Sequence, residues 1–432
     1  MLLDTVRQFA ARSTRWEKGA LAAWGIVLTV VCVRTATWPR THTVYPIFAL
    51  ASQNWLAGTS LYGQTPFDIY RYSPLVAAAF VPLGSLPLWL GGVFWRLLEA
   101  AVYGAALFWW CRFMTAARSS PNPYPTPKVS RFGIGFGPTY KTRDRNWMAV
   151  FLLLVLPLSL DNFNNGQSNL LMIGLVVLAI AACGTDRWNL AGACAAAACL
   201  LKIYPVVIAM LLSATHLRRF APRFLVALVA GILLPFVLQR PSYVLEQYQT
   251  WARYLGSEDR QGLSPALWYR DFRLLAHLWG IPITAAIYAL IQTTAGAGVA
   301  VICLAARRSG WPRHELGLLV LGLGSCWMTV FGVAAETSTY VIVTPVATWC
   351  VVDAWRRQRP AVVRLTYFAI YLSFGLARAA GSNEVTRPFS MVAQPCTALV
   401  LFFILFGTAL WRLQMRRLSD CAISISAPAQ AA

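Results

Sequence analysis

Residues 147–183 read WMAVFLLLVLPLSL, then DNFNNGQSN, then LLMIGLVVLAIAAC, so that two apolar runs flank nine polar-rich residues. Neither apolar run carries a charge, whereas residues 161–169 contain one acid and five carboxamides. Apolar runs of this kind predict helices that lie in a membrane. They recur along the chain at 20–36, 74–86, 88–111, 147–160, 169–183, 190–213, 224–239, 282–306, 315–335, 339–355, 361–378 and 389–411.

The composition supports the same class of protein. Hydrophobic residues make up 58% of the 432 residues and charged residues only 12%, whereas soluble domains contain roughly 45–50% apolar and about 25% charged residues. These values exclude a soluble enzyme, a disordered chain and a secreted disulfide scaffold. We therefore expect one all-α, polytopic integral membrane domain over residues 1–432, with about 10–12 transmembrane helices.

The net charge is +21, from 37 Lys and Arg against 16 Asp and Glu. The basic residues fall in short loops between apolar runs, which is the positive-inside pattern and not the footprint of a nucleic-acid-binding protein. We therefore expect no nucleic-acid partner and a multi-pass protein of the cell membrane. The N-terminus 1–19 and the clusters at 218–223, 307–313, 356–359 and 412–417 are predicted to be cytoplasmic, and the loops 37–73, 240–281, 335–338 and 378–388 to face outward.

The stretch 74–213 admits two topologies. If all the apolar runs cross, the basic linker 112–146 lies outside, against the positive-inside rule. If 74–86 is re-entrant and 190–213 is a hairpin, the linker lies inside and residues 161–169 lie outside. The linker is rich in Pro and Gly, and the small, polar tail 418–432 is predicted to be disordered.

The first outward loop carries a predicted short helix. Thr43 is a candidate cap, aromatic and apolar residues from Tyr45 to Leu56 recur at helical spacing, and Gly58 ends the helix. A helix with aromatic residues on one face just outside a span either lies in the membrane interface or covers the top of the bundle.

Five positions or stretches are candidates for chemistry. In the first loop, Asp68 and Arg71 are either a surface pair or ligand groups, since Arg71 offers a fork to a phosphate or a carboxylate. Residues 161–169 are either a polar turn that satisfies its own hydrogen bonds or a site for a polar ligand. Carboxamides suit sugar hydroxyls because each one both donates and accepts hydrogen bonds.

Lys202 is the only charge between Arg187 and Arg218, within an apolar stretch broken by Pro205. An intramembrane lysine predicts a functional site, for which an anionic lipid phosphate is a natural counter-ion, and snorkelling to the interface is the alternative. By contrast, Arg96 and Glu99 are spaced i, i+3 within one span, and we expect them to neutralise each other.

The outward loop 240–281 alternates charges with aromatic residues. It is either a solvated surface or a site in which Arg260, Arg270 and Arg273 hold a phosphate while aromatic rings stack on sugars. Further along, Glu336 is an isolated acid at an outward helix junction, which makes it either a base or a group that supports a helix N-terminus. No HExxH motif, nucleophile elbow or outward DxD pair is present, so neither a metal nor another cofactor is predicted.

The order of these motifs resembles bacterial polyprenol-phosphate-dependent glycosyltransferases of family 87, integral-membrane enzymes of the GT-C superfamily. The resemblance spans roughly residues 40–350 and rests on the order and spacing of its motifs. The matching stretches are Asn54–Tyr62 (NWLAGTSLY), Tyr70–Pro74 (YRYSP), Pro82–Pro87, Gly166–Asn169 (GQSN), Lys202–Pro205 (KIYP) and Glu336–Tyr340 followed by Pro345.

The resemblance implies a GT-C-like fold and transfer of a sugar such as mannose or arabinose from a polyprenyl phosphate to a glycan or glycolipid acceptor on the outer face. Such enzymes invert the anomeric centre, and generally need no metal. The phosphate would be held by Lys202, Arg71, Arg270 and Arg273, and the sugar by Gln167 and Asn169. Tyr72 lies within the Tyr70–Pro74 motif and Asp271 lies in the outward loop 240–281, and both are further candidates for substrate binding.

The catalytic acid of the family usually lies early in the first outward loop, just before a Tyr. Here residues 38–45 read WPRTHTVY and contain no carboxylate. The base is therefore His42, Asp68 or Glu336. Two rival functions remain: a transporter or flippase of an anionic lipid-linked or phosphorylated sugar, which needs no base, and a non-catalytic membrane subunit.

Overall fold

The computed structural model describes residues 14–62, 70–116, 143–257, 260, 262, 264–332, 334–381 and 385–426. Every regular element among these residues is a helix, as the sequence predicts. The α-helices are α2 (Arg15–Thr37), α3 (Tyr45–Ala57), α4 (Pro74–Gly84), α5 (Leu88–Ala116), α6 (Arg143–Asn165), α7 (Asn169–Gly184), α8 (Trp188–Leu201), α9 (Val206–Thr215), α10 (Ala221–Leu238), α11 (Pro241–Ser257), α12 (Phe272–Leu278), α13 (Ala285–Arg308), α14 (Arg313–Val330), α15 (Thr344–Arg356), α16 (Ala361–Ala380) and α17 (Arg387–Ser426), and two short 3₁₀ helices are η1 (Pro265–Leu267) and η2 (Thr337–Val343).

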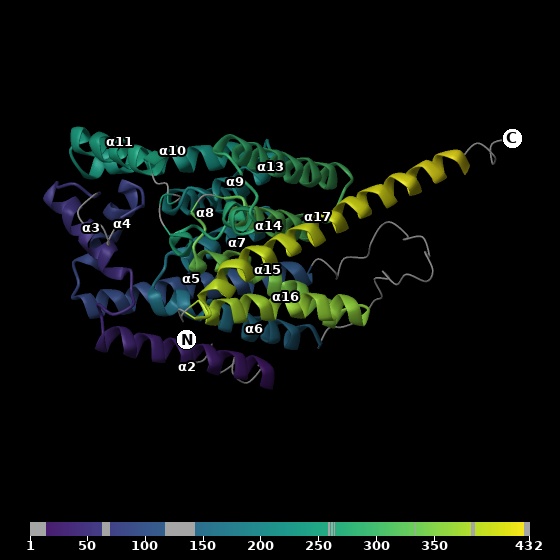
Figure 1. Ribbon diagram of the computed structural model, residues 1–432, viewed down its shortest axis with the longest axis horizontal. Helices are drawn as coiled ribbons and strands as arrows, with labels where there is room; N and C mark the ends of the chain where they lie inside the picture. The colour runs from purple at the N-terminus through teal and green to yellow at the C-terminus, as the bar shows by residue number, and fades with distance from the viewer. Residues whose placement is uncertain are drawn as a thin grey trace.

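The long helices run side by side along the long axis of the molecule (Figure 1). Among the described residues, seven helices are long and apolar enough to cross a membrane, namely α2, α5, α6, α10, α13, α16 and α17. This is fewer than the 10–12 expected. The runs at 74–86, 169–183 and 190–213 form the shorter apolar helices α4, α7, α8 and α9, and the runs at 315–335 and 339–355 form α14, η2 and α15, which are not among the seven. The chain is nonetheless an all-α polytopic membrane protein.

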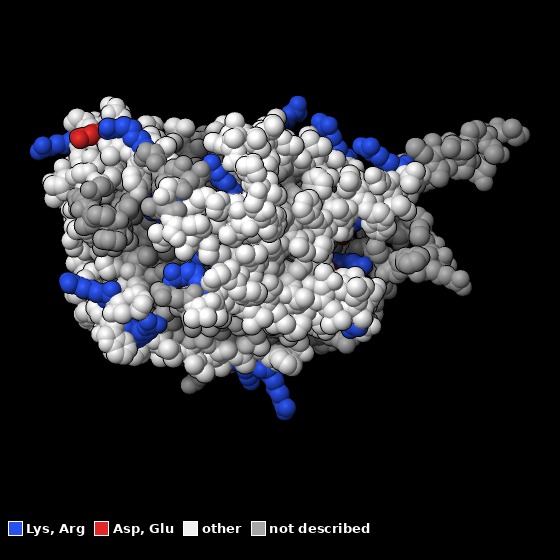
Figure 2. All heavy atoms as spheres, in the orientation of Figure 1, with Lys and Arg blue, Asp and Glu red and all other residues white. Residues whose placement is uncertain are grey.

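The outer surface of the bundle is apolar, as a lipid environment requires. In α10, Val226 is 71% exposed and Val237 is 83% exposed. Large exposed aliphatic residues along a helix are costly in water but match the hydrocarbon of a bilayer. On the face drawn in Figure 2, most side chains are uncharged, and Lys and Arg outnumber Asp and Glu.

The centre of the bundle is built on close contact between α5 and α7. A Cβ atom added at Gly174 of α7 would lie 3.1 Å from the Cα atom of Tyr103 of α5. Glycine therefore allows the two backbones to approach closely, as small residues do between membrane helices. This contact fixes the start of α7, where Asn169 lies, against α5.

The two ends of the bundle differ in character. At one end, α3, α4 and α11 gather (Figure 1), and we call this the outer end. At the opposite, basic end, Asp186 forms ion pairs with Arg219 at 3.3 Å and with Arg313. Arg412 pairs with Glu315 there as well.

Helices α8 and α9 form an antiparallel hairpin. Trp188, which begins α8, lies 5.3 Å from His216, which follows α9, measured between ring centroids. The hairpin turn is therefore at Lys202–Pro205, at the other end of both helices. This arrangement agrees with the second of the two topologies, in which 190–213 is a hairpin.

Helix α4 also agrees with that topology. It has 11 residues, which span about 16 Å, roughly half of the hydrocarbon thickness. Its last turn is bound to α3 by a hydrogen bond of 2.8 Å from the Tyr45 hydroxyl to the Leu83 carbonyl. Just before it begins, the Ser73 hydroxyl donates to the carbonyl of Leu200 at 2.7 Å.

The helix predicted in the first loop is present as α3, and Gly58 ends it in the left-handed conformation with a φ of 69°. Its aromatic face is buried against the bundle: the ring of Phe48 lies 4.9 Å from that of Phe80 and 5.5 Å from that of Trp95. These contacts match the alternative in which the helix covers the bundle. The predicted tail also differs, since α17 continues as a helix to Ser426.

Candidate active site

The turn between α8 and α9 presents Lys202 to the start of α7. Residue 202 has an extended backbone (φ −146°, ψ 143°), so α8 ends at Leu201. The ammonium of Lys202 donates to Oδ1 of Asn169 at 2.6 Å, and the Tyr204 hydroxyl donates to the same oxygen at 3.0 Å. A single amide oxygen thus fixes two side chains of the turn.

The amide of Asn169 is itself held from behind. Its Nδ2 donates to Oδ1 of Asn162 at 3.2 Å and to the carbonyl of Ser338 at 3.2 Å. Asn162 also donates to the Ser338 carbonyl, at 3.1 Å. Both asparagines are fully buried. One of these three hydrogen bonds lies within the polar turn 161–169 and two go to Ser338 in η2, and Asn169 directs its oxygen at Lys202.

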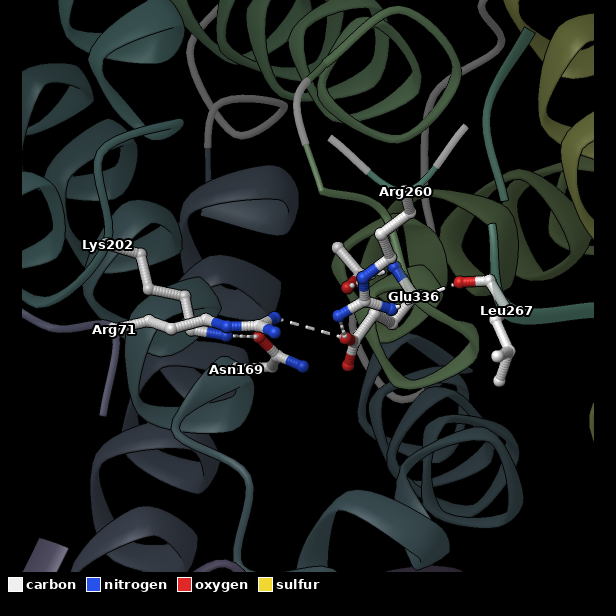
Figure 3. Close-up of polar contacts among 7 residues, drawn as sticks. Arg71, Asn169, Lys202, Arg260, Leu267 and Glu336 are labelled. Carbon is white, nitrogen blue, oxygen red and sulfur yellow. Dashed lines mark hydrogen bonds and ion pairs between the residues drawn. The ribbon is translucent and has the colours of Figure 1, made fainter. Parts of the chain in front are cut away.

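Glu336 lies opposite this turn and pairs with two arginines. Its Oε1 is 3.4 Å from Nη1 of Arg71 and 3.0 Å from Nη2 of Arg260. Figure 3 shows Arg71 and Lys202 extending toward Glu336 from one side, Arg260 reaching it from above, and Leu267 on the opposite side. The Glu336 side chain is 40% exposed, so a ligand can reach it.

The first loop positions Arg71 through its backbone. The Trp251 indole of α11 donates to the carbonyl of Arg71 at 3.0 Å, and the Tyr62 hydroxyl donates to the carbonyl of Tyr72 at 2.8 Å. The Tyr72 hydroxyl accepts a hydrogen bond from Ser168 at 3.1 Å. The ammonium of Lys202 lies 5.6 Å from the centroid of the Tyr72 ring. Tyr72 thus lies directly beside the lysine.

The candidate site brings three cationic side chains close to one carboxylate. Arg71, Lys202 and Arg260 surround Glu336, which is the acid that the described residues place in ion-pair contact with this group. With Lys202 charged, the four side chains carry a net charge of +2. A group of this charge attracts an anion such as a phosphate, and its arginines offer planar, two-pronged donors.

The stretch 270–273 begins with a residue that is packed into the protein. Arg270 is buried: its backbone nitrogen donates to the carbonyl of Ala335 at 2.6 Å, and its own carbonyl accepts from the Tyr340 hydroxyl. Burial lowers the pKa of the Arg270 guanidinium. Of the arginines in this loop, Arg260 is the one that reaches Glu336.

Asp271 is the N-cap of α12. Its Oδ1 accepts a hydrogen bond of 3.1 Å from the backbone nitrogen of Leu274. Burial raises the pKa of this carboxyl to about 6, although the hydrogen bond from Leu274 acts in the opposite direction. The guanidinium of Arg273 lies 5.8 Å from the centroid of the Tyr288 ring.

The three candidate bases are placed very differently. Glu336 lies in the cationic group described above. His42 is exposed, in a turn between α2 and α3, with a left-handed φ of 50°, and its side chain makes no polar contact among the described residues. Asp68 lies outside the described residues. The side chain of Gln167 is half-buried, and the hydrogen bonds of this residue among the described residues are made by its backbone, which donates to the carbonyl of Asn162 at 3.2 Å and accepts from the backbone nitrogen of Leu170 at 3.5 Å.

The expected pairing of Arg96 with Glu99 is absent from the part of the chain that the structure describes. Arg96 donates instead to the Thr43 hydroxyl at 2.8 Å and to the carbonyl of Asn164 at 3.0 Å. Both carboxylate oxygens of Glu99 are buried without a hydrogen-bond partner. The two charges interact electrostatically without a direct ion pair, because the Arg96 guanidinium binds the open carbonyl at the end of α6.

Sequence reasoning missed the residues that hold the site together. Asn162, Trp251 and Tyr204 bind backbone or amide groups from distant segments, as described above. Tyr204 was visible within the KIYP motif, next to Lys202. Nothing local in the sequence marks the contact of Trp251 with Arg71, because 180 residues separate them.

These features define a polytopic membrane protein with a positively charged, ligand-accessible site at its outer end. The model of glycosyltransferase family 87 matches residues 70–329, more than half of the 432 residues, and the chain belongs to that family. It is therefore a membrane glycosyltransferase. The matched range includes Arg71, Asn169, Lys202 and Arg260, whereas Glu336, Asp68 and His42 lie outside it. The comparison with curated proteins finds no match.

Proposed function

We propose that the protein transfers a mannose-like hexose from a polyprenyl-phosphate carrier to a glycan or glycolipid acceptor on the extracytoplasmic face of the cell membrane. The reaction proceeds with inversion and needs no metal. The observation that carries this proposal is the group formed by Arg71, Lys202 and Arg260 around Glu336. It lies beside Asn169, at the end of the bundle where the outward loops gather.

The charge of this group suits the donor. A polyprenyl-phosphate sugar is a phosphodiester with one negative charge, and the phosphate monoester that leaves carries about −1.5 to −2 at pH 7. Cations that are already in place stabilise this additional charge as it develops in the transition state. Lys202 and Arg71 are the phosphate-binding residues in this scheme, and Asn169 positions the lysine.

Glu336 is the proposed base. It accepts the proton of the acceptor hydroxyl while the acceptor oxygen forms a bond to the anomeric carbon. The bond from that carbon to the phosphate oxygen breaks, and the polyprenyl phosphate leaves with the electron pair. Arg71 and Arg260 orient the carboxylate. Asp68 is the alternative base, because it lies only three residues before Arg71.

The outer end of the bundle suits a lipid-linked donor. The exposed apolar helices place the cationic group next to the membrane, where a polyprenyl chain is soluble. A flippase would use the same cations but would need no base. Membership of a glycosyltransferase family favours the transferase.

A transfer assay tests the proposal. Purified protein in nanodiscs is mixed with radiolabelled polyprenyl-phosphate mannose, and in parallel with the glucose and arabinose donors, and membrane extract supplies the acceptor. We expect label in a new product, with the same rate in the presence of EDTA. Release of label that depends on a nucleotide sugar or on an added divalent cation would contradict the proposal.

A further inference from the structure

A cavity of about 290 Å³ lies between the segment after η1 and the start of α13. It is lined by Trp268, Arg273 and His277, together with Ile281–Thr284. Its volume is just below the range of about 300–1,000 Å³ that is typical of sites for drug-sized ligands. A space of this size suits a single sugar ring.

The walls of this cavity combine an aromatic surface with polar groups. The rings of Trp268 and His277 lie 4.5 Å apart between centroids, at 37° to one another. Arg273 contacts the ring of Tyr288. Among the described residues, the guanidinium of Arg273 forms no hydrogen bond or ion pair, so its donors are available to a ligand. Aromatic rings pack on the apolar faces of sugars, while arginine and histidine bind hydroxyl groups.

The cavity is linked to Glu336 through Arg260. Nη1 of Arg260 donates to the carbonyl of Leu267 at 3.3 Å, while its Nη2 binds Glu336 at 3.0 Å. Leu267 directly precedes Trp268 in the chain. In Figure 3, Arg260 reaches Glu336 from above, and Leu267 lies on the side of Glu336 away from Lys202 and Arg71. One guanidinium therefore spans the space between the candidate base and the segment that lines the cavity.

The chemistry of inversion requires this side to be occupied by the acceptor. In an in-line displacement, the leaving phosphate and the attacking oxygen lie on opposite sides of the anomeric carbon. If Lys202 and Arg71 hold the phosphate, the acceptor approaches from the side of Glu336 that faces Trp268.

We propose that this cavity is the acceptor subsite, in which a sugar ring of the acceptor packs on Trp268 while Arg273 and His277 bind its hydroxyl groups. This inference rests on the proposed function, because the direction from which the acceptor attacks follows from the proposed placement of the donor phosphate. It assigns the donor and the acceptor to opposite sides of Glu336.

The first test is kinetic and uses the full-length protein in nanodiscs. Trp268→Ala raises the KM for the acceptor roughly tenfold, which is the scale of one lost aromatic contact. Arg273→Gln acts in the same direction, and both variants leave the KM for the polyprenyl-phosphate donor within about twofold. Trp268→Phe keeps a ring and retains most of the affinity. Trp279→Ala is the matched control, because Trp279 is 51% exposed and lies outside the cavity lining.

The second test measures binding without transfer. Saturation-transfer NMR with methyl glycosides of mannose, glucose, galactose and arabinose detects contact with the protein directly. We expect signals from at least one glycoside in the wild type and in Trp279→Ala, and their loss in Trp268→Ala. This result would support the subsite even if no transfer were detected, which separates it from the proposed function. Equal signals in Trp268→Ala and wild type, absence of signal in the wild type, or a rise in donor KM alone would overturn the assignment.

Discussion

Asn169 shows how one buried amide sets the position of a cation. Its Nδ2 is committed to Asn162 and to the Ser338 carbonyl, so its oxygen faces Lys202. An amide that is held on both sides costs little to keep buried, because all of its strong hydrogen-bonding groups are satisfied. The lysine is therefore held in place before any ligand arrives.

This placement leads to a prediction for Lys202→Met. If the ammonium binds the donor phosphate, its loss raises the Kd of the polyprenyl-phosphate donor by about 10- to 100-fold, since a hydrogen bond to a charged group is worth about 1.5–3 kcal/mol. Lys18→Met is the control, because Lys18 is exposed on the first turn of α2. Donor affinities are measured by titration in nanodiscs. An unchanged Kd would make Lys202 a structural residue.

Gly166 directly follows α6, within the polar turn 161–169, and has a left-handed backbone conformation that is costly for other residues. Its φ is 65°, and a Cβ added there would lie 3.0 Å from the guanidinium of Arg96. Gly58 has a similar φ of 69° but open space around it. We expect Gly166→Ala to lower the melting temperature more than Gly58→Ala does. The Gly58→Ala change adds only the backbone strain of a left-handed alanine, about 1–2 kcal/mol, whereas Gly166→Ala also adds the contact with Arg96. Equal melting temperatures would show that Arg96 moves aside freely.

The sequence singled out Lys202 and Glu336 as isolated charges, and Arg71 as a fork-shaped donor close to Asp68. It did not reveal that Arg260 rather than Arg270 reaches Glu336. Both arginines lie in the same charged stretch, and only the packing of that loop on Ala335 buries Arg270. It also paired Arg96 with Glu99 on spacing alone, since the competing acceptors come from Thr43 and Asn164, which are remote in sequence.

At the scale of helices, the long and strongly apolar ones were predictable. The breaks that divide an apolar run into short helices were harder to predict. The run 190–213 was compatible with one span or with a hairpin. Pro205 has no backbone N–H to continue the helical pattern, and the chain turns back at Lys202–Pro205. This break creates the site, because it brings a charged residue to the end of two apolar helices.

Helix α12 carries a pH-dependent cost in its cap. The pKa of Asp271 is raised from 3.8 to about 6, chiefly by burial, so the folded state binds this proton more tightly than the unfolded state. Protonation of Asp271 therefore contributes fully to the free energy of unfolding below about pH 4. This contribution is lost as the pH rises to about 6. Asp271→Asn can still cap the helix but does not titrate.

We therefore expect the melting temperature of the wild type to fall relative to that of Asp271→Asn between about pH 4 and pH 6, with a constant difference above that range. The corresponding change in the free energy of unfolding is roughly 2–3 kcal/mol. Thermal unfolding at a series of pH values measures it. Parallel curves for the two proteins would show that Asp271 is not buried as described.

At the scale of the whole molecule, the hairpin and the short α4 favour one of the two predicted orientations of the chain in the membrane. They place the turn after α7 at the basic end, where Arg219 and Arg313 bind Asp186. If every apolar run crossed, that turn would instead be outside. From the sequence alone, the positive-inside rule distinguished only weakly between these topologies. The decision depended on the linker 112–146, which lies inside in one topology and outside in the other.

Cysteine labelling tests this orientation. Thr185→Cys, in the turn after α7, is labelled by a membrane-impermeant maleimide only after the cells are permeabilised, whereas Thr59→Cys, just after α3, is labelled in intact cells. Both threonines are exposed. The wild type is the control, because the cysteines whose surroundings are described are all buried or half-buried. Labelling of Thr185→Cys in intact cells would contradict the topology.

The measurement that tests the account most directly is the single-turnover rate of Glu336→Gln in nanodiscs, with donor binding measured on the same sample. If Glu336 is the base, the transfer rate falls by about 10²- to 10⁴-fold while the polyprenyl-phosphate donor still binds. Glu315→Gln, at the basic end, keeps the wild-type rate. A wild-type rate in Glu336→Gln, together with a loss of transfer in Asp68→Asn, would contradict the account and assign the base to the first loop.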